Sequence, residues 1–301
     1  MEYHNPVLLQ SSVDGLSIKP EGIYVDVTFG GGGHSKMILS KLETGKLFAF
    51  DQDISSNKNH IKHPNFKLIN ANFRYLKNFL RLEGIKKIDG LIADLGVSSY
   101  QLDIADRGFS IRLNGELDMR MNINSNLSAH EVVNNYTEKD LADMLYKYGD
   151  LRNSRKISAV IVDAREESQI NTTEDLVNIL NDLSPQKYRN KFLAKIFQAI
   201  RIEVNDEISC LEEMLLSSEE LLNIGGRLVV LSYHSIEDRL VKNLMKKGTL
   251  SGEVKKDFFG NVIKNLQEIN KKVIIASESE ISNNSRARSA KLRIAKKINE
   301  N

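Results

Sequence analysis

The sequence has 301 residues, of which 41% are hydrophobic and 27% are charged, as in an ordinary globular protein of one or two domains. No apolar stretch reaches the roughly 20 residues that cross a bilayer. The first residues lack the basic and apolar segments of a secretory signal. Cys210 is the only cysteine, so no internal disulfide can form. We therefore expect a cytoplasmic protein without a membrane anchor.

The net charge is only +2, but the positive charges are unevenly distributed. Residues 185–201 contain five Lys or Arg and no acid, and residues 286–297 contain six and no acid. Each run alone is typical of a solvated face. Two such runs in one nearly neutral chain favour a polyanionic partner.

The first hundred residues predict alternating strands and helices. β-rich runs occur at 23–27, 46–50, 66–69 and 88–93, and residues 35–42 have helical spacing. Strands separated by helices indicate a parallel, doubly wound α/β sheet.

This alternation stops at about residue 104. Helical patterns follow at 135–148, with Thr137 as the expected N-cap, and at 154–164 and 173–183. We therefore expect an α/β domain in two parts, 1–103 and 201–301, that is interrupted by an inserted helical domain at 104–200.

The last hundred residues predict a return to the α/β pattern. A long helix is expected at 196–222 and is ended by Gly225-Gly226. Strands are expected at 227–233, 271–276 and 290–295. Residues 248–270 are expected to be a mobile or partly helical excursion.

Four glycines, Gly30–Gly33, follow the first strand and precede a helix, where they let the backbone approach a ligand. The phosphate-loop pattern is absent, and the dinucleotide pattern G-x-G-x-x-G fails because Ser35 and Lys36 stand at its last position. The remaining ligand is a nucleoside without a pyrophosphate, such as S-adenosylmethionine. A tight turn without a ligand is the alternative.

Two acids strengthen the ligand interpretation. Asp51 ends the second strand, where a carboxylate can accept hydrogen bonds from ribose hydroxyls. Asp94 ends the fourth strand, at the edge where open α/β sheets bind ligands. Either acid alone could cap a turn, but the combination with the glycine loop is more specific.

The block 94–103, Asp-Leu-Gly-Val-Ser-Ser-Tyr-Gln-Leu-Asp, resembles the RsmH (MraW) family of bacterial 16S ribosomal RNA cytosine-N4 methyltransferases. Further matching blocks occur in the same order at 4–9, 28–35, 107–110, 117–121, 148–149, 197–202, 205–207, 225–228, 234–239 and 286–289. The resemblance therefore covers nearly the whole chain.

The resemblance implies a class I S-adenosylmethionine-dependent methyltransferase fold with an inserted helical domain. The family methylates the exocyclic N4 of one cytidine in the decoding region of 16S ribosomal RNA, within the small ribosomal subunit. By similarity, the contacts to S-adenosylmethionine fall on Gly32, Gly33, His34, Asp51, Phe73, Asp94 and Gln101. The sequence leaves a homodimer open.

Asp94 is the leading candidate for catalysis, because an acceptor that holds the cytosine N–H groups favours the nucleophilic form of the amine. Ser98 and Ser99 are further candidates, with turn formation as the alternative. His234 is expected either to orient the cytosine or to pack structurally. His34 is expected to shape the cofactor loop.

Other interpretations of the sequence concern the reaction class, a metal site and the role of three arginines. A DNA amine methyltransferase is disfavoured because Leu95–Ser99 lacks the Pro-Pro-aromatic stretch of that class. The alternative function is that of a non-catalytic RNA-binding ribosome-assembly factor that retains a nucleoside pocket, and the intact glycine loop, Asp51 and Asp94 argue against it. The isolated His60 and His63 predict no metal site. Arg107, Arg112 and Arg120 could contact RNA, or Arg120 could instead pair with Asp118.

Overall fold

The computed structural model describes residues 6–300, which divide into two compact units. The sheet unit contains the described residues up to Gly96 and from Ser209 onward, and the helical unit is Val97–Ile208. His4 and Asn5, which belong to one of the matching sequence blocks, lie outside the described residues.

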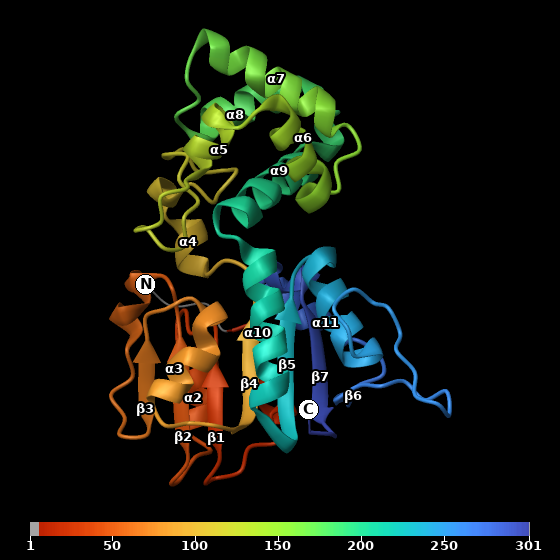
Figure 1. Ribbon diagram of the computed structural model, residues 1–301. Coiled ribbons are helices and arrows are strands. Elements are labelled where there is room, and N and C mark those ends of the chain that lie inside the picture. The colour runs from red at the N-terminus through yellow and green to blue at the C-terminus, as the bar shows by residue number, and fades with distance from the viewer. Residues whose placement is uncertain (1–5, 301) are drawn as a thin grey trace. The chain divides into compact units, whose positions relative to one another are not determined.

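The sheet unit is built on a seven-stranded sheet in the order β3-β2-β1-β4-β5-β7-β6 (Figure 1). The strands are β1 Ile23–Asp26, β2 Lys46–Phe50, β3 Phe66–Ile69, β4 Ile88–Asp94, β5 Leu222–Ser232, β6 Leu266–Glu268 and β7 Lys291–Lys297. The first five are parallel, whereas β7 runs antiparallel to both β5 and β6. The predicted doubly wound α/β sheet is confirmed.

Helices cover both faces of this sheet. They are α1 Leu9–Gly15, α2 Gly33–Leu39, α3 Leu76–Leu82, α10 Glu207–Leu221, α11 Ser235–Lys247 and α12 Glu278–Asn283, with short 3-10 helices at Ile54–Asn59, Phe73–Tyr75 and Ser285–Ser289. On one face, α1 and α2 share a core with Ile92, Val229 and Leu231. Because side chains alternate along a strand, Leu228 and Val230 point to the other face and are buried there too.

Central strand β4 shows why its local sequence suits this position. Its middle part, Gly90–Ala93, is apolar and buried, as expected of a parallel strand that is covered on both faces. A Cβ at Gly90 would lie 2.9 Å from the ring of Tyr24, which is buried on the neighbouring strand β1. Glycine is therefore required where this ring crosses the strand.

The C-terminal predictions needed corrections. The long helix predicted at 196–222 is broken at Asn205 and Asp206, and Asp206 has a left-handed backbone with φ 48°. Strand β5 begins at Leu222, so Gly225-Gly226 lie within the strand and do not end a helix. Gly225 has φ +87°, and the pairing of β4 with β5 shifts register there.

The edge strand was also predicted in the wrong place. Residues 271–276 form only an isolated bridge, between Ile274 and Leu292. Strand β6 instead lies within 248–270 and pairs with the end of β7. It has three residues, of which only Leu266 is buried, so it is too short to show strand periodicity in the sequence.

The helical unit contains α4 Ser99–Asp103, α5 Ala129–Asn135, α6 Glu138–Gly149, α7 Ser154–Glu167, α8 Thr173–Leu180 and α9 Arg189–Val204, with 3-10 helices at Ala105–Arg107, Asn181–Leu183 and Gln186–Tyr188. Thr137 caps α6, as predicted, by accepting the Asp140 N–H at 3.1 Å. Helix α5 was not predicted. No helix among the described residues is both long and apolar enough to cross a membrane.

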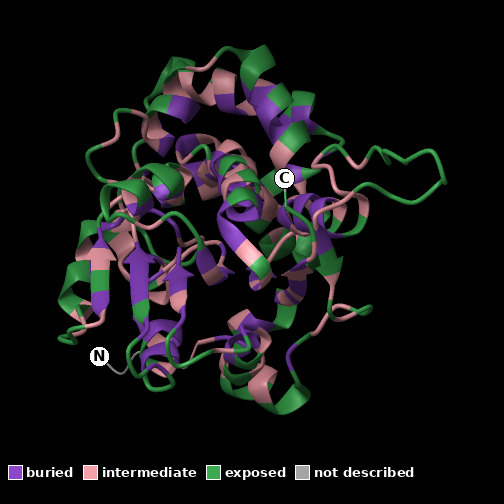
Figure 2. Ribbon diagram, turned by 60° about the horizontal axis from the view of Figure 1, so that its bottom comes forward, coloured by how far each residue is buried: buried purple, intermediate pink, exposed green. Residues whose placement is uncertain are grey.

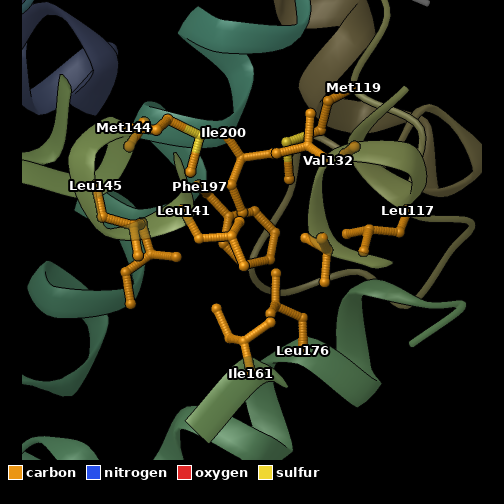
Figure 3. Packing of buried hydrophobic residues seen from close by; sticks show 14 of the residues in the cluster. Leu117, Met119, Val132, Leu141, Met144, Leu145, Ile161, Leu176, Phe197 and Ile200 are labelled. Carbon is orange, nitrogen blue, oxygen red and sulfur yellow. The ribbon is translucent and has the colours of Figure 1, made fainter. Parts of the chain in front are cut away.

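The helical unit has a hydrophobic core of its own. Phe197 and Ile200 of α9 pack with Leu141 of α6, Val132 of α5 and Ile161 of α7 (Figure 3). The long connection before α5 joins this core through buried residues such as Leu117 and Met119. A core that is contained within Val97–Ile208 is what an independently folding unit requires.

The connection before α5 is held by polar side chains from the matching sequence blocks. Asn205 donates to the Met119 carbonyl at 2.8 Å and accepts the Met121 N–H at 2.7 Å. Arg107 donates to the carbonyl of Arg120 at 2.8 Å. These contacts give the block residues a structural role within the helical unit.

Candidate functional site

The candidate site lies at the carboxyl ends of the parallel strands in the sheet unit. The strand order reverses between β1 and β4, because β2 and β3 continue on one side and β5 on the other. Open α/β sheets bind ligands at such a switch point. Both the glycine loop, which follows β1, and Asp94, which ends β4, are therefore located where a ligand is expected.

The glycine loop requires glycine for two different reasons. Gly30 and Gly32 have φ values of 49° and 75°, a left-handed region that disfavours other residues. Gly33 has an ordinary φ, but a Cβ there would lie 2.1 Å from Cγ of Pro6. A Cβ at Gly30 would meet only the Thr28 carbonyl oxygen, at 3.9 Å, so the loop leaves open space beside its backbone.

Asp51 connects the end of β2 to this loop. Its carboxylate accepts the N–H of Gly30 at 2.8 Å and the N–H of Asp53 at 2.9 Å. Asn59 fixes the other side of the loop by donating to the Gly30 carbonyl at 2.9 Å. Burial raises the pKa of Asp51 to about 6, despite these hydrogen bonds. A carboxylate has further lone pairs, so Asp51 can still accept hydrogen bonds from a sugar.

Asp94 is held in place by two hydrogen bonds. Its backbone N–H donates to the hydroxyl of Thr28 at 2.7 Å, and the phenol of Tyr233 donates to its Oδ1 at 2.6 Å. Nδ1 of His34 lies 3.9 Å from its Oδ2. Burial raises the pKa of Asp94 to about 7. This group can therefore accept or release a proton near neutral pH.

Asp26, at the end of β1, was missed as a site residue. It is almost fully buried, and its carboxylate accepts the Ser35 hydroxyl at 2.7 Å and the Thr28 N–H at 3.1 Å. Burial raises the pKa of Asp26 and lowers the pKa of the neighbouring His34. The signal in the sequence is an acid at the end of a short strand whose other members are apolar.

Phe73 begins the 3-10 helix that follows β3, and its ring is partly buried. Asn72 caps this helix by accepting the Arg74 N–H at 2.9 Å. The Asn72 amide also donates to Gln52 at 2.8 Å and to the sulfur of Cys210 at 3.3 Å. Asn72 thus ties the Phe73 turn to the segment after β2 and to α10.

Three of the predicted site residues, Ser98, Ser99 and Gln101, belong to the helical unit. The Ser98 hydroxyl accepts the Gln101 N–H at 3.2 Å, and the Gln101 side chain accepts the Ser98 N–H at 3.0 Å. This capping box starts α4, with Ser99 as the first helical residue. Their assignment to catalysis and cofactor binding stays a prediction.

His234 caps the N-terminus of α11. Its Nε2 lies 3.1 Å from Oε1 of Glu237, and Oε2 of Glu237 accepts the backbone N–H of Tyr233 at 2.8 Å. Both the His234 and Glu237 side chains are buried. The structure thus shows a structural contact for His234, while its predicted role toward cytosine stays a prediction.

Several charges of the two basic runs take part in internal contacts. In the run 286–297, Arg293 and Lys291 pair with Asp238 at 2.7 and 3.3 Å. Lys297 of the same run is buried and donates to the Glu219 carbonyl at 2.6 Å.

In the run 185–201, Arg201 pairs with Glu207 through two hydrogen bonds, and Lys195 lies 3.7 Å from Asp150. The exposed members that are left are Lys187, Lys191 and Arg288. Arg120, finally, pairs with Asp118.

Comparison with known proteins gives the family. The model of the MraW methylase family matches residues 1–298. The proteins named ribosomal RNA small subunit methyltransferase H of Christiangramia forsetii and of Flavobacterium johnsoniae are each 55% identical to this chain over 299 residues, which is 99% of both chains. The protein of that name from Bacteroides fragilis is 53% identical over 296 residues, 98% of this chain and 97% of its own.

Likeness to solved structures is more distant. An rRNA methylase from Streptococcus thermophilus is 12% identical, with a TM-score of 0.43 and 99% of each chain covered. The assignment therefore rests on the family model and on the high identity to full-length relatives. With its mixed seven-stranded α/β sheet and its helical insertion, the chain belongs to the MraW methylase family.

Proposed function

We propose that this protein transfers a methyl group from S-adenosylmethionine to the exocyclic N4 of a cytidine in the decoding region of 16S ribosomal RNA. The observation that carries the proposal is Asp94, a carboxylate fixed by Thr28 and Tyr233 at the switch point of the sheet. Membership of the MraW methylase family supports both the reaction and the substrate. Ribosomal subunits as substrate would place the enzyme in the cytoplasm.

The residues at the switch point fit S-adenosylmethionine. The glycine loop has open space beside Gly30 and carries no side chain that would fill it. Asp51 supplies a carboxylate for the ribose hydroxyls, and Phe73 supplies a partly buried ring for the adenine. The glycine loop lacks the sequence patterns of the phosphate loop and of the dinucleotide site. We also assign Gly32, Gly33 and His34 of the glycine loop to cofactor binding. For Gln101, the same role stays a prediction from the family resemblance.

The reaction places specific demands on the protein. When bound, S-adenosylmethionine supplies an electrophilic methyl group on a sulfonium. The protein has to hold the cytosine amine in line with this group, which is catalysis by positioning. The lone pair of the amine is delocalised into the ring, so the amine becomes nucleophilic only when its N–H groups are held out of the ring plane.

Asp94 meets this demand. Tyr233 occupies Oδ1, which orients the carboxylate and leaves Oδ2 to accept an N–H of the amine. As positive charge develops on N4, the ionised carboxylate stabilises it, and Asp94 then takes the proton. Burial, which raises the pKa of Asp94 to about 7, makes it a stronger base than an exposed aspartate. Ser98, Ser99 and His234 are proposed to help orient the base.

Product analysis tests this function. Small ribosomal subunits that lack the modification are incubated with the protein and methyl-labelled S-adenosylmethionine, and the RNA is digested to nucleosides for mass spectrometry. We expect labelled N4-methylcytidine and none on subunits that already carry the modification. Label in another nucleoside, or no label in RNA, would contradict the proposal.

A further inference from the structure

The segment after α11 carries a small ordered hairpin, residues 254–263, here called the Phe hairpin. Lys256 and Val262 form an antiparallel bridge, and the Ile263 N–H donates to the Lys255 carbonyl at 2.9 Å. Figure 1 shows it as the blue loop that extends at the right beyond α11 and β6. The sequence predicted only a mobile or partly helical excursion here.

Asp257 organises the tip of this hairpin. Its carboxylate accepts the N–H groups of Phe259 and Asn261, both at 2.9 Å, and the Asn261 amide at 3.1 Å. These hydrogen bonds, led by the one from Asn261, hold the pKa of Asp257 below its usual range. Gly260 completes the turn with φ 85°. The tip therefore holds its shape through its own local contacts.

The side chains on this ordered tip are strongly apolar and exposed. Phe258 is 98% exposed and Phe259 is 85% exposed, and Val254, Val262 and Ile263 are exposed to lesser degrees. Figure 2 shows the whole hairpin as exposed ribbon. Such a concentration of exposed apolar side chains contributes nothing to the core and marks an interaction surface.

The geometry of the two rings suits flat ligands. Their centroids lie 5.6 Å apart and their planes meet at 87°. Each ring thus presents its faces in a different direction, so each can stack on a separate partner. Flat apolar faces of this kind are offered by unpaired nucleic-acid bases.

The charge of the hairpin favours the same partner. Lys255 and Lys256 directly precede the tip, are exposed, and have no ion-pair partner among the described residues. The one acid, Asp257, is engaged within the turn. Aromatic rings beside free lysines are the combination by which proteins bind single-stranded nucleic acid, with the rings on bases and the lysines on phosphates.

We propose that the Phe hairpin is a second RNA contact, in which Phe258 and Phe259 stack on unpaired bases of the ribosomal RNA and Lys255 and Lys256 bind its phosphates. This inference rests on the proposed function for the choice of RNA, and it adds a contact outside the methyl-transfer site. A ribosomal protein as the partner is the alternative outcome of the test below.

Binding of small subunits in the presence of S-adenosylhomocysteine tests the contact without turnover. We expect the double variant Phe258→Ala/Phe259→Ala to weaken binding at least fivefold, since each stacked base contributes substantially to affinity. The matched control is Leu82→Ala, another exposed apolar residue of the sheet unit, at 80% exposure. Both variants lie outside the core, and equal melting temperatures would confirm that each is folded. Unchanged affinity of the double variant would overturn the proposal.

A photo-crosslinker identifies the partner. Phe258→p-benzoylphenylalanine is irradiated on subunits, with the same group at Leu82 as background. We expect crosslinks to ribosomal RNA. Crosslinks to a ribosomal protein alone, or none above background, would overturn the proposal. Because binding is measured separately from transfer, a wild-type protein that binds through the hairpin but transfers no methyl group would contradict the proposed function and leave this inference standing.

Discussion

The surroundings of Asp94 determine its pKa. Burial raises its pKa to about 7, while the hydrogen bond from Tyr233 limits the rise. The other charged or titratable groups that face it are His34, Glu237 and Asp26. Burial and the nearby Glu237 raise the pKa of Asp94, and the hydrogen bond from Tyr233 lowers it, so the carboxylate ionises close to neutral pH.

The pH dependence of transfer follows from this environment. A protonated Asp94 cannot accept an N–H proton, so the single-turnover rate should rise with pH through an apparent pKa near 7 and level off above it. The rate is measured between pH 5.5 and 8.5 with saturating substrates. A rate that is flat down to pH 5.5 would remove Asp94 from the proton-transfer step.

The Tyr233→Phe variant tests the hydrogen bond alone, because it keeps the ring and removes the hydroxyl. Loss of the donor destabilises the ionised carboxylate, so the pKa of Asp94 should rise. We expect the acidic limb of the pH profile to move to higher pH, with a loss of rate that is largest below pH 7 and partly recovered at pH 8.5. A uniform loss at every pH would indicate a purely structural role.

At the scale of elements, the basic C-terminal strand combines structural and candidate RNA-binding charges. In β7, Arg293 pairs with Asp238, and the two side chains are only 11% and 13% exposed. Although burial alone would raise it, Arg293 and Lys291 hold the pKa of Asp238 below its ordinary value. Arg288, before the strand, is exposed.

Two single substitutions separate these roles. Arg293→Ala removes the closer of the two partners of Asp238 and leaves only Lys291, so it should lower the free energy of unfolding by about 2 kcal/mol. Arg288→Ala should change it by less than about 0.5 kcal/mol, but should reduce the salt dependence of RNA binding by about one unit in the log–log slope. Urea unfolding and binding at several salt concentrations measure both effects. If Arg288→Ala instead lowered the free energy of unfolding and Arg293→Ala instead reduced the salt dependence of RNA binding, these roles would be wrong.

The sequence predicted elements well where the signal is local. Strands at 46–50 and 66–69 and the Thr137 cap agree with the structure, because periodicity and capping act within a few residues. Strand β6 and the break at Asn205 were missed, because they depend on pairing with β7 and on contacts with the loop at Met119. Such contacts join residues that are distant in the sequence.

In the candidate site, too, local signals could be predicted from the sequence, whereas contacts between distant residues could not. Asp51 and Asp94 could be placed by sequence, because the carboxyl ends of parallel strands meet at one edge of the sheet. The contact between Tyr233 and Asp94 could not, because 139 residues separate the two. Only the fold shows that β5 brings the phenol beside the end of β4.

At the scale of the whole molecule, the chain combines two units with separate cores. The helical unit holds a core of residues from five of its helices, and its loop is fixed by its own Asn205 and Arg107. Residues 97–208 expressed alone should therefore fold, with a cooperative thermal transition in circular dichroism and a helical spectrum. A spectrum without a transition would show that the unit depends on the sheet unit for its structure.

The role of Asp94 in methyl transfer is tested by comparing Asp94→Asn with the wild type and with Asp14→Asn, a matched substitution at an exposed acid of α1. Single-turnover transfer from labelled S-adenosylmethionine to unmodified small subunits is measured together with cofactor affinity. We predict that Asp94→Asn loses at least a hundredfold in transfer rate at saturating cofactor and remains folded, while Asp14→Asn transfers normally. A near-normal rate for Asp94→Asn would contradict the central claim that this carboxylate accepts the proton of the methylated amine.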